Sequence, residues 1–276
     1  MTTTSDPMPD GTAPAALYER SGHVAVIRLN RPQALNAVNA ALSTAVGEAL
    51  ERAATDPEVR VVVVTGNGRA FCAGADLKEL AAGRSVAAPE HPEWGFAGLV
   101  RHWIDKPLVA AVNGFAMGGG TEIALACDLV VAAEDARMGL PEVRRGLIAA
   151  AGGVVRLQRQ IPLKRALQMA LTGDAVDVRQ AAEWGLVNVV ARPGAALEEA
   201  LALAERIAAN APLSVQHTKR VMHAVAAAGS DWNPDWSRRE VWAVNDEATD
   251  VVFASRDAVE GPTAFAEKRP PVWEGR

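Results

Sequence analysis

Two glutamates and a run of glycines in the middle of the chain are residue types that acid–base chemistry requires. Residues 118–120 are all glycine, and Glu122 with an apolar helical pattern follows at once, which predicts a turn that opens a helix. The first N–H groups of such a helix have no intrahelical partner and favour negative charge. Glu142 follows Pro141 further along the chain. Free amides beside two carboxylates could stabilise an oxyanion and move protons next to it, which predicts an enzyme.

A second glycine-rich turn lies upstream. Residues 59–64 are rich in valine, as in a strand buried on both faces of a parallel sheet, and an Ala-Gly-Ala-Asp turn at 73–76 precedes a further helical pattern. Either glycine turn alone is more often structural than functional. Ligands in open α/β sheets bind where strand ends meet helix starts, so the two turns together predict one ligand site.

Hydrophobic and helical periodicity predicts the elements that must position these residues. Strands and helices alternate through the first half, at spacings typical of right-handed crossovers: a hairpin at 18–30, helices at 37–54, 99–104 and 120–127, and strands at 59–64, 108–112 and 128–133. Helices dominate after Gly152, at 163–171, 178–184, 196–210, 213–228 and 235–253, with one short strand at 186–190. The Pro- and Gly-rich residues 83–98 form either a surface loop or a lid whose aromatics, Trp94 and Phe96, line a pocket.

The composition is that of a globular protein. The 276 residues are 49% hydrophobic and 22% charged, enough for one large domain with a substantial core. A net charge of −5 without a basic run argues against nucleic acid as a partner. Cys72 and Cys127 lie in apolar surroundings and suit a reducing compartment. Metal-ligand spacing, membrane-spanning apolar runs and a signal-peptide pattern are not found, which predicts a cytoplasmic protein without a metal site or membrane contact.

Five motifs occur in an order that resembles one family. They are LNRPQALNAV (29–38), FCAGADLKEL (71–80), KPLVAAVNGFAMGGGTEIALACDLVVAAEDARMGLPE (106–142), LTGDAVDVRQAAEWGLVNVV (171–190) and FAEKRPPVW (265–273). From about Leu17 to its end, the chain resembles the enoyl-CoA hydratase/isomerase, or crotonase, family. The resemblance implies an α/β fold, a crotonase-like spiral of ββα units with a C-terminal helical region, assembled as a homotrimer or a dimer of trimers. The expected parts are a flexible leader (1–14), the spiral core (15–200) and a C-terminal helical oligomerisation region (201–276).

The resemblance also implies roles for the residues singled out above. In similar proteins two backbone amides, here those of Ala75 and Gly119, bind the thioester oxygen as an enolate forms. Two glutamates, here Glu122 and Glu142, flank the C2–C3 bond. Glu142 would exchange the C2 proton, and both would hold and activate the water that adds at C3. One carboxyl must then be protonated while the other is ionised, and close like charges in a partly apolar pocket separate their pKa values in this way.

Coenzyme A is expected as part of the substrate, and no other cofactor is implied. Its predicted contacts are Gln33, Ala34, Leu35, Ala73, Ala75, Asp76, Leu77 and Lys78, with Phe265 and Lys268 of a neighbouring subunit near the adenine. Lys78 is either a phosphate contact or a solvated helix lysine. Two features depart from the family pattern: Gln33 stands where relatives often have a basic residue, and residues 148–153 read IAAAGG where relatives often have IPGxGG.

The predicted function is an enoyl-CoA hydratase that adds water across the C2–C3 double bond of a 2-enoyl-CoA thioester. An enoyl-CoA isomerase or a specialised acyl-CoA dehydratase of the same fold is the alternative. A non-catalytic or RNA-binding relative would leave both glutamates unexplained and conflicts with the acidic balance. A serine peptidase on a related spiral fold would need a serine on a glycine-rich strand-to-helix turn, and the sequence offers none.

Overall fold

A computed structural model describes residues 2–3, 13–228, 247 and 249–276 of the chain. It divides into two compact units. The first comprises Met1–Ile104 and Leu108–Glu205, and the second comprises Asp105–Pro107 and Arg206–Arg276.

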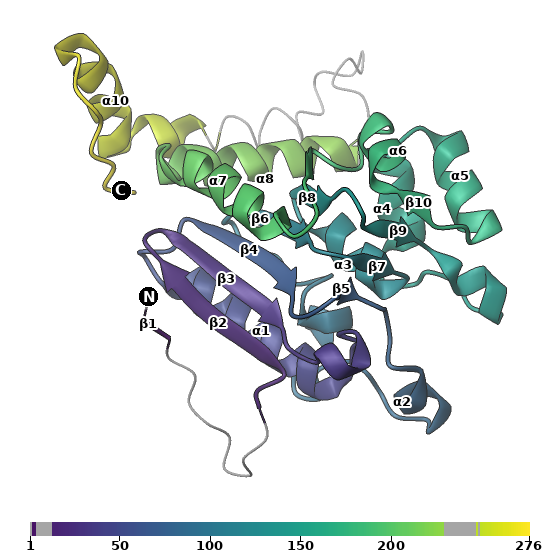
Figure 1. Ribbon diagram of the computed structural model, residues 1–276. Helices are drawn as coiled ribbons and strands as arrows, with labels where there is room; N and C mark the ends of the chain where they lie inside the picture. The colour runs from purple at the N-terminus through teal and green to yellow at the C-terminus, as the bar shows by residue number, and fades with distance from the viewer. Residues whose placement is uncertain (1, 4–12, 229–246, 248) are drawn as a thin grey trace. The chain divides into compact units, whose positions relative to one another are not determined.

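The first unit is built on a large sheet with strand order β1-β2-β3-β4-β6-β8-β11 (Figure 1). Its strands are β1 (Thr2–Thr3), β2 (Ala16–Ser21), β3 (Val24–Leu29), β4 (Val61–Gly66), β6 (Leu108–Val112), β8 (Leu129–Ala133) and β11 (Val189–Ala191). β2 and β3 form the predicted antiparallel hairpin, and every pair from β3 to β11 is parallel. All residues of β4 and β6 are buried, because apolar side chains on both faces are typical of a central parallel strand.

A second, four-stranded sheet with order β10-β9-β7-β5 runs beside the first. Its strands are β5 (Ala70–Cys72), β7 (Phe115–Met117), β9 (Arg137–Gly139) and β10 (Val176–Asp177). The strands β4, β6 and β8 of the large sheet are each followed by one of these short strands and then by a helical segment, as in β4–β5–α2 (Leu77–Ala81) and β6–β7–α3 (Gly119–Ala126). The repeat is the ββα unit, and it carries the two glycine turns to neighbouring strands, since β5 and β7 pair in parallel.

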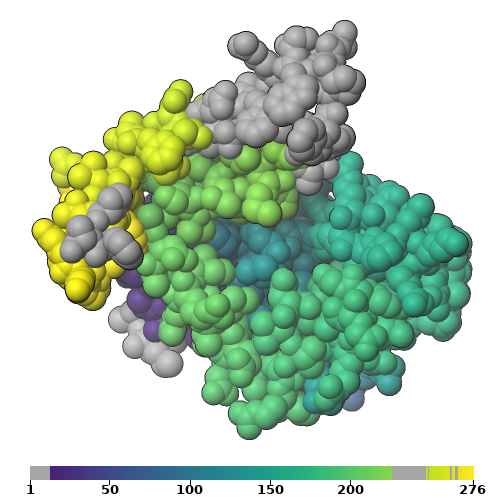
Figure 2. All heavy atoms as spheres, turned by 90° about the horizontal axis from the view of Figure 1, so that it is seen from above, coloured from purple at the N-terminus to yellow at the C-terminus, as the bar shows by residue number. Residues whose placement is uncertain are grey.

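The helices of the first unit pack against both sheets. They are α1 (Ala40–Thr55), α2 (Leu77–Ala81), α3 (Gly119–Ala126), α4 (Gly153–Gln160), α5 (Leu163–Thr172), α6 (Val178–Glu183) and most of α7 (Ala196–Ala208), with 3-10 turns η1 (Pro32–Ala34), η2 (Pro92–Trp94), η3 (Phe96–Gly98) and η4 (Pro141–Arg145). α1 begins three residues later than predicted because the Asn39 side chain accepts from the Leu42 N–H and caps it there. Figure 2 shows the α4–α6 segment in teal as one continuous surface.

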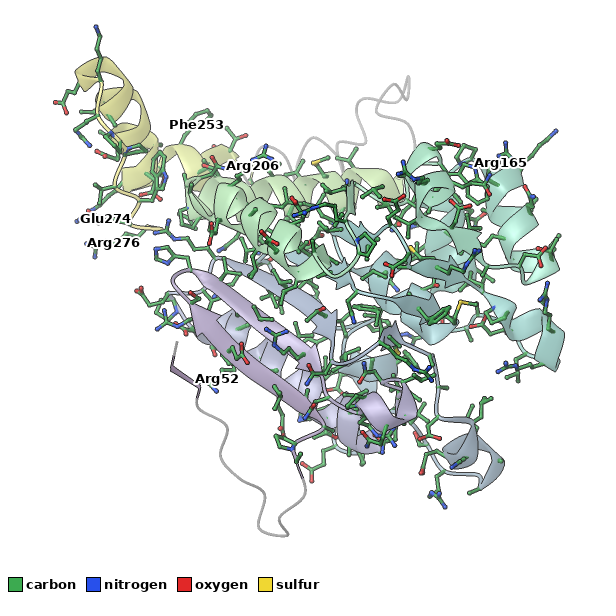
Figure 3. The ribbon with its side chains drawn as sticks, in the orientation of Figure 1. Arg52, Arg165, Arg206, Phe253, Glu274 and Arg276 are labelled. Atoms are coloured by element: carbon green, nitrogen blue, oxygen red, sulfur yellow. The ribbon has the colours of Figure 1, made fainter. Side chains whose placement is uncertain are left out.

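Two of these helices, α1 and α5, make cation–π contacts through arginine side chains. The Arg52 guanidinium of α1 lies over the Tyr18 ring of β2, 4.3 Å from its centroid. The guanidinium of Arg165, a residue of α5 labelled in Figure 3, lies 5.3 Å from the centroid of the Trp184 ring. Such cation–π contacts on exposed surfaces contribute about 0.5–1 kcal/mol each.

The helix predicted at 99–104 is wrong. Ala97 and Gly98 have φ angles of 56° and 64°, which reverse the chain, and the Arg101 N–H donates to the Trp94 carbonyl across the reversal. Because the Arg101 N–H is bonded to Trp94 and not to the carbonyl four residues earlier, residues 99–104 form a turn and irregular structure instead of an α-helix.

The second unit contains the end of α7, α8 (Pro212–Ala228) and α10 (Arg256–Glu267). The C-terminal tail returns to α10, where the Arg256 N–H donates to the Arg276 carbonyl and the Glu274 carboxylate pairs with both arginines (Figure 3). Most of the helix predicted at 235–253 lies outside the described residues. Of the helices that the structure describes, none is long and apolar enough to cross a membrane.

Candidate active site

One cavity of the first unit, with a volume of about 290 Å³, collects the residues predicted for chemistry. Ala75 and Gly119 come from the two glycine turns, and Glu122 and Glu142 come from α3 and η4. All four line this cavity, although they come from three separate stretches of the sequence, since Gly119 and Glu122 both lie in α3. The structure therefore brings these four residues together at one cavity.

The two glycine turns lie directly against each other. Gly74 has a φ of 95°, and a Cβ added to it would stand 3.0 Å from the Met117 carbonyl oxygen and 3.2 Å from the Gly119 nitrogen. Only a residue without a side chain allows this approach. Within the described part of the chain, the structure shows no hydrogen bond from the N–H of Ala75 or Gly119. Gly119 is the first residue of α3, so its N–H has no intrahelical partner.

Phe96 closes one side of this arrangement. Its ring comes from η3 and lies against Gly119, where an added Cβ would be only 2.4 Å from two ring carbons. Gly119 is therefore glycine because the aromatic ring occupies the space of a side chain. Phe96 is part of the cavity lining, and sequence analysis offered it only as one of two aromatics in the 83–98 segment.

Glu122 is a buried carboxyl held by a helix terminus. Its Oε1 accepts a 2.8 Å hydrogen bond from the N–H of Gly153, the first residue of α4. Burial raises the pKa of Glu122 from 4.5 to about 7, the Gly153 N–H opposes this rise, and the nearby Glu142 charge adds to it. A carboxyl with this pKa exchanges a proton readily near neutral pH.

The Glu142 side chain lies against Gly118. A Cβ added to Gly118 would lie 2.8 Å from Glu142 Oε1, so the glycine makes room for the carboxyl. Glu142 Oε2 is buried and has no hydrogen-bond partner among the described residues. Burial raises the pKa of Glu142, and the Arg145 charge opposes the rise. A buried carboxyl oxygen without a protein partner is suited to bind a water molecule or a substrate atom.

The segments predicted to contact coenzyme A lie side by side. The Ala73 N–H donates to the Leu35 carbonyl at 3.0 Å, and the Asp76 N–H donates to the Val38 carbonyl at 2.8 Å. The carboxylate of Asp76 has structural partners, since it caps α2 through the Lys78 N–H and pairs with Arg31 at 3.0 Å. Gln33, Leu77 and Lys78 are exposed, while Ala34 and Leu35 are half-buried.

The prediction for Phe265 and Lys268 concerns a neighbouring subunit. Both belong to the second unit, where Phe265 lies in α10 and Lys268 follows it with an exposed side chain. The structure does not describe the side chain of Phe265. Their contact with adenine stays a prediction.

Two residues that hold the site together were missed. Asn36 is fully buried; its Nδ2 donates to the carbonyls of Asn67 and Ala70, and its Oδ1 accepts from the Arg31 N–H. Arg31 in turn pairs with Asp76. Asn36 has a φ of 56°, a conformation that asparagine adopts more readily than most residues, but a single asparagine in a loop gives no signal of burial.

The 83–98 segment divides between the two interpretations left open for it. Phe96 and Val86 line the cavity, as expected of a lid. Trp94 instead is buried against Gly47 and stacks between His91 and His102, with ring centroids 3.9 and 4.8 Å away. One aromatic thus faces the site and the other belongs to the core.

The cavity's remaining lining is largely apolar. Besides Phe96 and Val86 it includes Leu80, Leu147 and Ile148, and its one basic residue is Arg145. Ala149 and Ala150 stand where the family often has proline and glycine, and the Gly153 N–H is bonded to Glu122. Across the described residues, no group of three or more His, Cys, Asp or Glu side chains could hold a metal ion.

Comparisons with known proteins identify the family of the chain. The family model described as enoyl-CoA hydratase/isomerase matches residues 19–276. A carnitinyl-CoA dehydratase of Salmonella typhi is 41% identical over 259 residues, covering 93% of this chain and 97% of that protein.

Two solved structures extend the comparison. An enoyl-CoA hydratase of Mycobacterium tuberculosis is 45% identical with a TM-score of 0.88, and a carnitinyl-CoA hydratase of Mycobacterium avium is 55% identical with a TM-score of 0.75. Each match covers 96% of this chain and 100% of the other. The likeness confirms the predicted α/β spiral, and the chain belongs to the enoyl-CoA hydratase/isomerase family.

Proposed function

We propose that this protein is a hydro-lyase that adds water reversibly across the C2–C3 double bond of a 2-enoyl-CoA thioester. The observation that carries the proposal is a single cavity lined by two glycine-turn residues, whose amides have no partner in the described structure, and by two glutamates, the buried Glu122 and the half-buried Glu142. Membership of the family supports it. Coenzyme A enters as part of the substrate, and the proposal requires no resident cofactor or metal.

The mechanism assigns each of the four residues one task. The amides of Ala75 and Gly119 donate to the thioester oxygen as it gains negative charge, and each such donor contributes about 3–4 kcal/mol. Glu122 and Glu142 hold the water whose oxygen bonds to C3. Glu122, as the ionised carboxylate, takes the water's proton, and Glu142, as the protonated carboxyl, gives its proton to C2, which completes the addition. Burial raises the pKa of both carboxyls and suits them to exchange protons near neutral pH.

The assembly and location follow the family resemblance. We propose a homotrimer or a dimer of trimers in the cytoplasm, with no nucleic-acid or membrane partner. Residues 33–35 and 73–78 carry the coenzyme, Lys78 contacts its phosphates, and Phe265 and Lys268 of a neighbouring subunit reach the adenine.

Two candidate substrates differ in whether the acyl group carries a positive charge. A carnitinyl thioester, named in some relatives, carries a quaternary ammonium group at C4. Such cations are usually bound by several aromatic faces. In the described cavity Phe96 is the one aromatic, Trp94 is turned into the core, and Arg145 would repel a cation. Leu80, Leu147 and Ile148 favour an uncharged, apolar acyl chain.

A matched pair of thioesters tests both the hydration reaction and the preference for an uncharged acyl chain. But-2-enoyl-CoA and its 4-trimethylammonio derivative have the same chain and differ only in the charged group. We expect the full-length protein to hydrate the first with a kcat/KM about 100-fold higher or more, because an apolar lining does not replace the hydration of a cation. Loss of the enoyl absorbance measures both reactions, and the Glu122→Gln protein gives the background.

Two outcomes would contradict different parts of the proposal. If neither thioester is hydrated, the proposed function fails. If the trimethylammonio substrate is preferred, the reaction stands and the assignment of the acyl group is wrong.

A further inference from the structure

Arg156 is a charged side chain near the cavity that the mechanism above does not use. It lies in the first turn of α4, three residues after Gly153, whose N–H binds Glu122. It is half-buried, which lowers the pKa of its guanidinium. A guanidinium stays charged in proteins, so burying it is costly unless it gains partners.

Its contacts reach two separate parts of the site. One Nη2 hydrogen bond goes to the carbonyl oxygen of Val100. Its Nη1 covers Gly152, where an added Cβ would lie only 2.3 Å away, immediately before the Glu122-binding amide. The positive charge also interacts favourably with the Glu122 carboxylate.

Val100 belongs to a short segment, residues 94–102, which we call the Phe96 strap. Trp94 anchors its start against Gly47. The His102 ring anchors its end, with Nδ1 3.0 Å from the Gly98 carbonyl and Nε2 2.8 Å from Glu51. Phe96 lies between these anchors and rests on Gly119. The contacts of Trp94 and His102 are with α1 and with the strap itself, whereas Arg156 connects the strap to α4.

We propose that Arg156 is a positioning residue that ties the Phe96 strap to the N-terminus of α4, and so keeps Phe96 on Gly119 while Gly153 holds Glu122. The inference rests on the proposed hydratase function for its kinetic test. Its structural part, the tie between strap and helix, can be measured without turnover.

The charge of Arg156 gives the role a pH signature. Glu122 is faced by the Glu142 carboxyl from η4, by Arg156 from α4 and by the backbone N–H groups of Ala151 and Gly153. Arg156 is itself faced by Arg101 of the strap and by Cys127 after α3. Removing the arginine charge destabilises the ionised carboxylate, so the apparent pKa of the glutamate pair must rise. A side chain that merely packs would leave this pKa unchanged.

Three variants of the full-length protein separate these effects. Arg156→Gln removes both the positive charge and the planar guanidinium group with its several N–H donors. Arg156→Lys keeps the charge but not the planar group. Arg159→Gln, at an exposed arginine on the same helix, is the control. The kcat/KM for but-2-enoyl-CoA is measured over about pH 5.5–9. We expect Arg156→Gln to move the acid limb to higher pH by about 0.5–1 unit and to lower kcat about tenfold or more at pH 7.

The other variants fix the interpretation. Arg156→Lys should leave the limb in place with a smaller loss of kcat, and Arg159→Gln should match the wild type. Hydrogen exchange of residues 94–102 should be faster in Arg156→Gln than in Arg159→Gln. An unshifted limb together with unchanged exchange would overturn the inference.

The kinetic and structural readouts also distinguish the two proposals. If the wild type hydrates no enoyl-CoA, the proposed function is wrong. The contact between the strap and α4 is then tested only by comparing hydrogen exchange of residues 94–102 in Arg156→Gln and Arg159→Gln. If Arg156→Gln does not fold, the Lys variant decides: unchanged exchange and unchanged kcat in Arg156→Lys would contradict the tie.

Discussion

At the scale of single residues, the two glutamates share a cavity but differ in what surrounds them. Glu122 receives an N–H from Gly153, whereas Glu142 Oε2 has no hydrogen-bond partner in the described part of the chain. Burial raises the pKa of both carboxyls, and their mutual repulsion resists double ionisation. One protonated and one ionised carboxyl is the state that water addition requires.

Replacing either acid by its amide tests this pairing. Glu122→Gln and Glu142→Gln should each lower kcat for but-2-enoyl-CoA by about 100-fold or more, because an amide exchanges no proton. In Glu122→Gln the amide oxygen of the new side chain can still accept from the Gly153 N–H, so the fold should survive, as circular dichroism would show. Glu198→Gln, the same change at an exposed position of α7, is the control. Full activity in one glutamine variant would remove that residue from the mechanism.

The raised pKa of Glu122 also makes stability depend on pH. Between pH 4.5 and about 7 the folded chain keeps a proton on this carboxyl that the unfolded chain has lost. The free energy of unfolding therefore falls as pH rises through this window, by up to about 3 kcal/mol for this group. Urea titrations of the wild type and Glu122→Gln should show a smaller fall in the variant. Parallel pH dependences would mean that Glu122 titrates normally in the folded state.

At the scale of elements, the Phe96 strap owes its path to a close approach between Gly98 and α1. Gly98 has a φ of 64°, and an added Cβ would lie 2.0 Å from the Ser43 carbonyl oxygen. Gly83, in the same predicted loop, has a φ of 68° with nothing within 4 Å. The two glycines thus share a backbone conformation and differ only in their surroundings.

This pair provides a matched stability test. Gly83→Ala should lower the free energy of unfolding by about 1–2 kcal/mol through backbone strain alone. Gly98→Ala adds a collision with the α1 backbone, so we expect a loss about 2 kcal/mol greater. Urea unfolding measures both. Equal losses would show that the strap moves away from α1 without cost.

The start of α3 provides a second test at this scale. Phe96 occupies the space of a Gly119 side chain, so substitutions there need the Phe96→Ala background. In that background Gly119→Ala keeps the N–H and Gly119→Pro removes it, while proline suits the first helical position. We expect kcat about 100-fold lower for the proline protein. Similar rates in the two proteins would exclude the Gly119 amide from oxyanion binding.

At the scale of the whole molecule, the ββα repeat explains how distant motifs form one site. β5 and β7 are neighbours in the small sheet, so the turns that follow them meet, and their residues line one cavity. The larger sheet fixes the repeat through buried parallel strands. Ligand sites at such strand ends recur in open α/β proteins for the same reason.

The proposed assembly makes a simple prediction about mass. The chain has a mass of 29.0 kDa, so light scattering of the purified full-length protein should give three or six times this value. Dilution toward nanomolar concentration should leave the mass unchanged, because obligate interfaces are large and apolar. A monomer at all concentrations would contradict the trimer and the predicted roles of Phe265 and Lys268.

Much of the frame could be predicted from the sequence. Valine-rich runs mark β4, β6 and β8 because both faces of a central parallel strand are apolar, and helical periodicity marks α1, α5, α6 and α8. The glycine turns and both glutamates were also recognisable, since their residue types restrict what the backbone and the side chains can do there.

Only the tertiary structure decided how these parts meet. β5, β7 and β9 have three residues each, too few for a periodic pattern, yet they bring the two turns together. Trp94 and Phe96 are two residues apart and have opposite roles, and Arg156 reaches Val100 across 56 positions of the chain. Local patterns are encoded by side-chain periodicity along the chain. Contacts between remote segments depend on which surfaces pack, and a single sequence does not state that pairing.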